Sequence, residues 1–111
     1  MRRISVAQDF TRFPSGRYKR NGTTSGEQFR QDFLEISLKD GQLIAVELDG
    51  TIGYGSSFLE EAFGGLVRAL KLTPSSLREK LTLVSQDPAL IEEINGYIED
   101  AGLEMKKNDG R

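Results

Sequence analysis

Two adjacent hydroxyl groups, those of Ser56 and Ser57, lie where a glycine-rich turn is expected to pass into a helix. Gly50, Gly53 and Gly55 in that turn permit backbone conformations that other residues avoid, and they let another molecule approach the main chain. The helix start behind them would offer free N–H groups and a positive dipole end, which suit an anion or a phosphoryl group. We therefore interpret the two serines as a recognition site or a phosphorylation switch.

Ser57 also has a purely structural explanation. The spacing Ser57-x-x-Glu60 fits a capping box, in which the serine holds the helix end and contributes about 1 kcal/mol. Ser56 would then precede the cap and be the more exposed hydroxyl. A helix boundary one residue away exchanges these roles, so both serines remain candidates.

The turn does not match the known phosphate-binding loops. A P-loop requires Gly-Lys-Ser/Thr, and this turn has no lysine. A dinucleotide-binding turn requires G-x-G-x-x-G, whereas Gly53-x-Gly55-x-x ends in Phe58. We therefore do not expect a nucleotide at this position.

The 111 residues include no cysteine and no histidine. Disulfides, thiol chemistry, zinc sites of the Cys/His kind and Ser–His–Asp catalysis are therefore excluded. We expect no metal, no cofactor and no enzymatic activity. The sequence predicts neither a membrane span nor a signal peptide, so we expect a cytoplasmic protein with no membrane partner.

The charge balance gives no general reason to expect nucleic-acid binding, because 15 lysines and arginines accompany 17 aspartates and glutamates, a net charge of −2. The predicted loop 9–22 is nevertheless both aromatic and basic. It holds Phe10, Phe13 and Tyr18 among Arg12, Arg17, Lys19 and Arg20. Such interleaving is typical of proteins that bind single-stranded nucleic acid, but we expect the rings to hold the loop against the core instead.

Strands alternate with helices along the chain, which predicts an α/β fold of right-handed β-α-β units. We expect about four strands in a mostly parallel sheet, packed against three to four helices. The predicted strands are 3–7, 43–48, 81–85 and, as an edge strand, 103–105. The predicted helices begin at Thr24 or Ser25, at Ser56 or Ser57, at Pro74 and at Pro88, and Gly102 is expected to end the last one. The domain would span residues 1–105, followed by a flexible tail at 106–111.

The predicted central strand and the predicted second helix each have an unusual composition that requires an explanation. The segment 43–48 is nearly all apolar, which predicts a central strand covered by helices on both faces. Gly64 and Gly65 interrupt the predicted second helix, and each costs roughly 0.8–1 kcal/mol relative to alanine. We expect close packing inside the domain to compensate, with a partner interface as the alternative.

Three stretches of the chain resemble a known family. They are Asp9-Phe10 with Phe13-Pro14-x-Gly16-Arg17, then Ser25-Gly26-Glu27-x-Phe29-Arg30, and the run Asp49-Gly50-x-x-Gly53-x-Gly55-Ser56-Ser57-Phe58-Leu59-Glu60-Glu61-Ala62-Phe63-Gly64-Gly65-Leu66. Over residues 6–101 the chain resembles the STAS-like domain family of unknown function, small bacterial proteins related in fold to the STAS domains of anti-sigma factor antagonists. The resemblance implies a regulatory domain that acts by protein–protein interaction.

In STAS antagonists the corresponding turn carries Asp-Ser-Ser/Thr-Gly-Leu. One hydroxyl there is phosphorylated by a kinase-type anti-sigma factor, and phosphorylation breaks the partner complex. That motif aligns with Ser56, Ser57 and Leu59, whereas its Asp becomes Gly55 and its Gly becomes Phe58. The resemblance therefore implies a phospho-switchable partner of a histidine-kinase-like ATPase or an anti-sigma-type kinase.

The expected interaction or ligand residues surround this turn. They are Arg17, Ser25, Glu27, Arg30, Asp49, Gly53, Gly55, Glu60 and Glu61. A phosphate on either serine would be repelled by Glu60 and Glu61, which would disrupt a docked partner. As an alternative, Arg17, Arg30, Asp49 and Ser56 would form a small-ligand-binding or catalytic cluster. Homo-oligomerisation also remains open.

Overall fold

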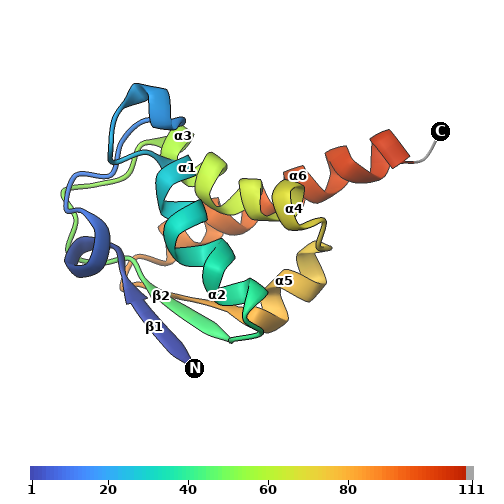
Figure 1. Ribbon diagram of the computed structural model, residues 1–111, viewed down its shortest axis with the longest axis horizontal. Coiled ribbons are helices and arrows are strands. Elements are labelled where there is room, and N and C mark those ends of the chain that lie inside the picture. The colour runs from blue at the N-terminus through green and yellow to red at the C-terminus, as the bar shows by residue number, and fades with distance from the viewer. Residues whose placement is uncertain (110–111) are drawn as a thin grey trace.

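The computed structural model describes residues 1–109 and has an α/β fold, in which a small parallel sheet packs against helices (Figure 1). The sheet has three strands in the order β1-β2-β3: β1 (Arg2–Ser5), β2 (Ile44–Glu47) and β3 (Leu81–Val84). Both neighbouring pairs are parallel, and Ile4, Val46 and Leu83 share one register position. The predicted class and the central position of the second strand are therefore confirmed.

The predicted fourth strand is wrong, because residues 103–105 belong to the helix α6 (Pro88–Asp109). Gly102 lies inside that helix and does not end it. A Cβ atom at Gly102 would lie 2.5 Å from Cγ of Pro74, so the glycine serves close packing between two helices. The predicted tail is helical as far as Asp109, and residues 110–111 lie outside the described part of the chain.

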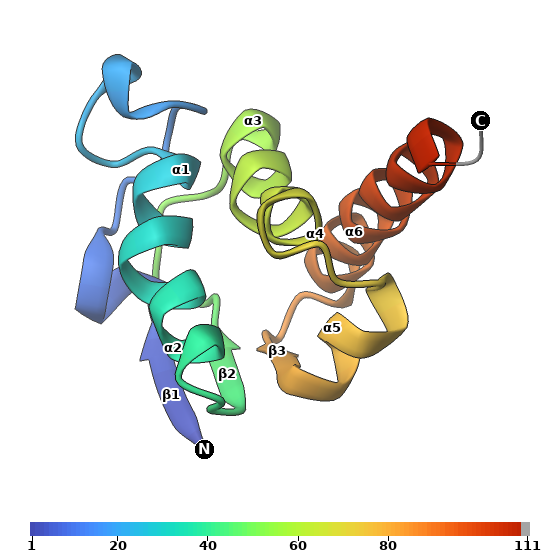
Figure 2. The same ribbon diagram turned by 45° about the vertical axis from the view of Figure 1, so that its right-hand side comes forward.

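Before α6 the chain forms two helical rods, and the central segment of each rod is a π-helix. The first comprises α1 (Gly26–Phe29), η3 (Arg30–Glu35) and α2 (Ile36–Lys39), and the second comprises α3 (Ser56–Leu59), η4 (Glu60–Gly64) and α4 (Gly65–Leu70). The shorter elements are η1 (Val6–Phe10), η2 (Lys19–Asn21) and α5 (Pro74–Lys80). Figure 2 shows the first rod, the second rod and α6 side by side, with the second rod between the other two. We call this second rod, residues 56–70, the middle rod.

The helices cover one face of the sheet, so the prediction that β2 is covered on both faces is wrong (Figure 1). Strands in the order 1-2-3 with crossovers of one hand place all their connecting helices on the same side. The opposite face carries polar groups, among them the Arg3–Glu47 ion pair. Ala45 is buried on that face, which explains why the segment reads as continuously apolar.

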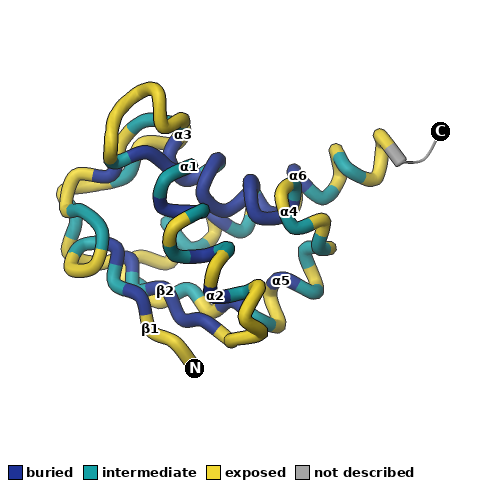
Figure 3. Tube along the Cα trace, in the orientation of Figure 1, coloured by how far each residue is buried: buried dark blue, intermediate teal, exposed yellow. Residues whose placement is uncertain are grey.

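The middle rod forms the core of the domain (Figure 3). Phe58, Leu59, Ala62, Phe63, Leu66 and Val67 are all fully buried. Phe10 joins this core from η1, with its ring centroid 5.3 Å from that of Phe29. Phe13 and Tyr18 do not, because they are 59% and 37% exposed. The prediction that aromatic rings hold the first loop against the core is therefore confirmed for one ring of the three.

Candidate functional site

The serine turn, residues 49–57, joins β2 to the middle rod. The helix begins at Ser56 with Gly55 as its N-cap, and no serine side chain caps it. The predicted capping box at Ser57 is therefore wrong, because the N-cap lies two residues earlier. Its other member, Glu60, instead bonds to Arg17 and Arg68. Both serines are consequently free of the capping role and exposed to solvent.

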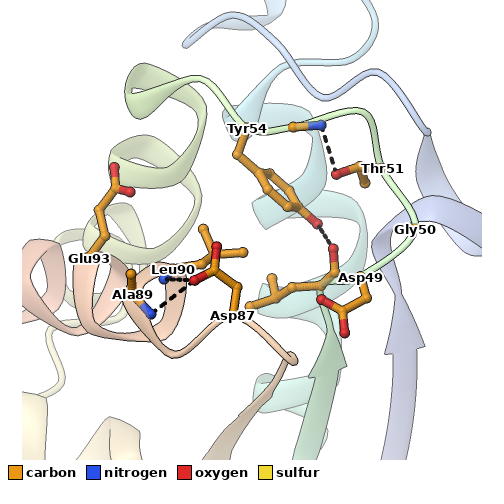
Figure 4. A pocket seen from close by; sticks show the side chains of 10 residues that line it. Asp49, Gly50, Thr51, Tyr54, Asp87, Ala89, Leu90 and Glu93 are labelled. Atoms are coloured by element: carbon orange, nitrogen blue, oxygen red, sulfur yellow. Dashed lines mark hydrogen bonds between the residues drawn. The ribbon is translucent and has the colours of Figure 1, made fainter.

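Internal hydrogen bonds fix the shape of this turn. Gly50 and Gly53 have φ of 102° and 137°, conformations that favour glycine. The hydroxyl of Tyr54 donates to the carbonyl oxygen of Leu48 at 2.6 Å (Figure 4). Burial raises the pKa of Tyr54 to about 12, so this donor keeps its proton at neutral pH. The turn is thus a rigid platform, on which Ile52 is 72% exposed.

The two serines have different surroundings. Ser57 precedes Glu60 and Glu61 by three and four residues, the spacing that places side chains on one helix face. Ser56 lies against Tyr97 of α6. The pKa of the Tyr97 hydroxyl is raised, chiefly by its hydrogen bond to Glu93, and hydrogen bonding with Ser56 acts in the opposite direction. Ser56 is also four residues before Glu60, so what distinguishes the two serines is the contact of Ser56 with Tyr97.

A cleft of about 390 Å³ lies beside the turn, at the carboxyl edge of the sheet, where α/β folds commonly bind ligands (Figure 4). Three carboxylates line it, and each already has a hydrogen-bond donor. Asp49 accepts from Ser85 at 2.7 Å and from the Gln86 amide, and these two bonds lower the pKa of Asp49. Asp87 caps α6, and Glu93 accepts from Tyr97. The negative charge of this cleft disfavours a phosphate or another anion.

A chain of alternating charges connects the first loop and the first rod to the middle rod. We call it the ion network; it contains Arg17, Arg30, Glu35, Glu60, Glu61 and Arg68. Three cations and three carboxylates balance each other. No side-chain nitrogen or oxygen buried among the described residues lacks a hydrogen-bond partner.

The two ends of the network differ in burial. Arg30 and Glu61 are buried and 2.5 Å apart, and Arg30 also donates to the Glu61 carbonyl at 2.9 Å. Arg17 and Glu60, also 2.5 Å apart, are partly exposed. Burial opposes ionisation of Glu60, but hydrogen bonds from Arg68 and Arg17 outweigh it and lower its pKa. Glu60 is therefore ionised at neutral pH.

The glycine pair in the middle rod is explained by packing inside the domain, as predicted. A Cβ at Gly65 would lie 2.3 Å from Nη1 of Arg30, and one at Gly64 would lie 3.3 Å from the carbonyl oxygen of Tyr97. The first rod and α6 therefore approach the middle rod through these two glycines. The π-helical turns η3 and η4 begin at Arg30 and Glu60, and such turns frequently mark functional sites.

The structure brings together four of the predicted site residues: Arg17, Arg30, Glu60 and Glu61. It places the others apart, since Ser25 caps α1, Glu27 accepts from the Lys19 amide, and Asp49 lies in the cleft. The proposed cluster of Arg17, Arg30, Asp49 and Ser56 has no common contact among the described residues. The sequence analysis missed Glu35, Arg68 and Tyr97. Arg68 had a weak signal, because it is a charge on an otherwise apolar helix, two turns after Glu60.

Within residues 1–109, no group of three or more Asp or Glu side chains is arranged to hold a metal ion. No helix in that range has the length and apolar character needed to cross a membrane.

Comparison with protein families matches residues 25–89 to the STAS-like domain of unknown function (DUF4325). The match includes the Ser25-Gly26 motif, the whole serine turn and most of the ion network, while Arg17 lies outside it. No curated protein and no solved structure matches this chain. More than half of the chain lies within the match, and the chain therefore belongs to the family of STAS-like domains of unknown function.

Proposed function

We propose that this chain is a non-enzymatic regulatory domain that binds another protein through its serine turn. One observation carries the proposal: two exposed hydroxyls and an exposed Ile52 lie together on a turn whose backbone is rigid. A preformed surface loses little conformational entropy on binding, which favours affinity. The isoleucine provides an apolar anchor, and the hydroxyls provide hydrogen bonds.

Phosphorylation of Ser56 or Ser57 would switch this surface. A phosphate adds roughly −1.5 to −2 charges where the partner docks. The repulsion expected from Glu60 and Glu61 is reduced, because both carboxylates are paired with arginines. The phosphate would therefore leave the stability of the free domain nearly unchanged and would lower the affinity for the partner. By the family resemblance, the partner is a histidine-kinase-like ATPase or an anti-sigma-type kinase.

The test begins by purifying the tagged protein from its own host and identifying co-purified proteins and phosphosites by mass spectrometry. The recombinant partner is then titrated calorimetrically with Ser56→Glu and Ser57→Glu. We expect at least one variant to bind at least tenfold more weakly, since a charge left buried and unpaired in an interface costs about 2–5 kcal/mol.

A matched control exists in α5. Ser75 is an exposed serine at the second position of its helix, as Ser57 is in α3, so Ser75→Glu adds the same charge at an equivalent helix position elsewhere. Its binding should equal that of the wild type. Normal binding by both serine-turn variants would rule out the switch.

A further inference from the structure

The first loop forms a second exposed surface, chemically distinct from the serine turn. We call residues 11–22 the basic loop; it carries four cations and no carboxylate, in a protein whose net charge is −2. Figure 3 shows it projecting from the domain with most of its length exposed. Arg17 is held by the ion network. The other three cations, Arg12, Lys19 and Arg20, form no ion pair with any described carboxylate.

Two aromatic rings lie between these cations. Phe13 is 59% exposed, although Pro14 beside it is buried and anchors the chain. The ring of Tyr18 is 37% exposed, and the Arg20 guanidinium lies over it, 4.7 Å from its centroid. Neither ring contributes to the core, so the packing explanation that applies to Phe10 does not apply to them.

The loop is held in shape by hydrogen bonds between its backbone and residues 24–27, at the start of the first rod. Ser15 donates to the Thr24 carbonyl at 3.1 Å, and Gly26 and Glu27 donate to the carbonyls of Gly16 and Arg17, each at 3.0 Å. The Glu27 carboxylate accepts from the Lys19 amide. The exposed rings and cations are therefore presented by a fixed framework and do not depend on ligand binding for their position.

We infer that the basic loop binds single-stranded nucleic acid, with Phe13 and the Tyr18–Arg20 pair stacking on bases and with Arg12 and Lys19 contacting phosphates. Single strands are bound where cations follow the backbone and exposed aromatic or guanidinium planes stack on bases. Phe13 and Tyr18 are five positions apart in the chain, which limits their Cα separation to about 18 Å and suits a strand of a few nucleotides. An acidic protein surface would satisfy the cations but would leave the two exposed rings without a role.

The test is fluorescence anisotropy of the full chain with labelled oligo(dT) and oligo(U) of roughly 12 nucleotides, a length within the usual site sizes. We expect binding at low salt, with log K falling against log salt with a slope of about −1.4, because each of the two cations that contact phosphates contributes about −0.7. Phe13→Ala should weaken binding about tenfold, as expected for loss of one stacked base. The unfolding midpoint of this variant should not change, because Phe13 lies outside the core.

The charge control uses two exposed lysines of α6. Lys19→Glu with Arg20→Glu should abolish binding, whereas Lys106→Glu with Lys107→Glu changes the net charge equally and should weaken it far less. No binding by the wild type at low salt would overturn the inference. So would equal loss in the two double variants, unchanged affinity of Phe13→Ala, or equally tight binding of duplex DNA or heparin, each of which indicates attraction to any polyanion.

Discussion

Gly26→Ala should force the first rod and the middle rod apart. Gly26 is the buried first residue of α1, and it faces the start of the middle rod. A Cβ there would lie 2.4 Å from the carbonyl oxygen of Phe58 and 3.1 Å from the amide nitrogen of Ala62. Both are backbone atoms of a helix, and they cannot rotate away as the end of a side chain can. One rod must therefore shift as a body.

The expected cost follows from overpacking. Inserting a methyl group into a well-packed contact commonly costs 1–3 kcal/mol, and the rigid backbone here favours the upper half of that range. We expect a loss of about 2 kcal/mol in the free energy of unfolding, since alanine's better helix propensity offsets part of the strain. For a domain of this size that loss lowers Tm by about 8 °C.

Gly96→Ala is the matched control, because Gly96 is also a helical glycine but a Cβ there would meet no atom within 4 Å. This variant should be stabilised by up to about 1 kcal/mol through helix propensity alone. Urea unfolding followed by far-UV circular dichroism measures both. If Gly26→Ala is as stable as the wild type or as Gly96→Ala, the rods do not contact each other as closely as described.

Two further predictions concern titration and a single hydrogen bond. Because the folded pKa of Glu60 is depressed, its ionised form stabilises the protein above the unfolded value of about 4.3, and this contribution is lost as the pH falls through the lower folded pKa. Tm should therefore fall less between about pH 5 and pH 3 in Glu60→Gln than in the wild type. An equal fall in both proteins would contradict the pairing of Glu60 with Arg17 and Arg68. Tyr54→Phe leaves the buried Leu48 carbonyl without its donor and should cost about 1–3 kcal/mol in urea unfolding. Tyr97→Phe removes a hydroxyl bonded to the exposed Glu93 and should lower the free energy of unfolding by less. Equal losses in the two variants would show that the buried bond to Leu48 stabilises the protein no more than the exposed one.

Much of the fold could be predicted from local sequence patterns. The strand predicted at 43–48 occupies Ile44–Glu47, and the strand predicted at 81–85 occupies Leu81–Val84. Such strands are short apolar runs bounded by turn residues, a signal that does not depend on distant contacts. The segment 103–105 was also predicted as a strand but is helical, because it continues a rod of 22 residues whose Gly102 serves packing against Pro74. A three-residue window could not reveal that contact.

The ion network lay beyond any local rule. Arg17 and Glu60 are 43 residues apart, and Arg30 and Glu61 are 31 apart. Sequence spacing predicts ion pairs three or four residues apart on one helix, whereas these pairs depend on how the first loop and the first rod pack against the middle rod. The failed capping box involves the same contacts, since the Arg17 and Arg68 side chains hold the Glu60 carboxylate that the capping box required.

The structure divides the family-like motifs into two groups by what their side chains contact. Ser25 caps α1, Gly26 admits the middle rod, and the buried Arg30–Glu61 pair joins the two rods. Packing alone is therefore sufficient to explain these positions. Ser56 and Ser57 differ, because neither caps the helix and both are exposed at its start. Side chains that neither cap a helix nor pack in the core are free to contact another molecule, which is why we propose the serine turn as the interaction surface.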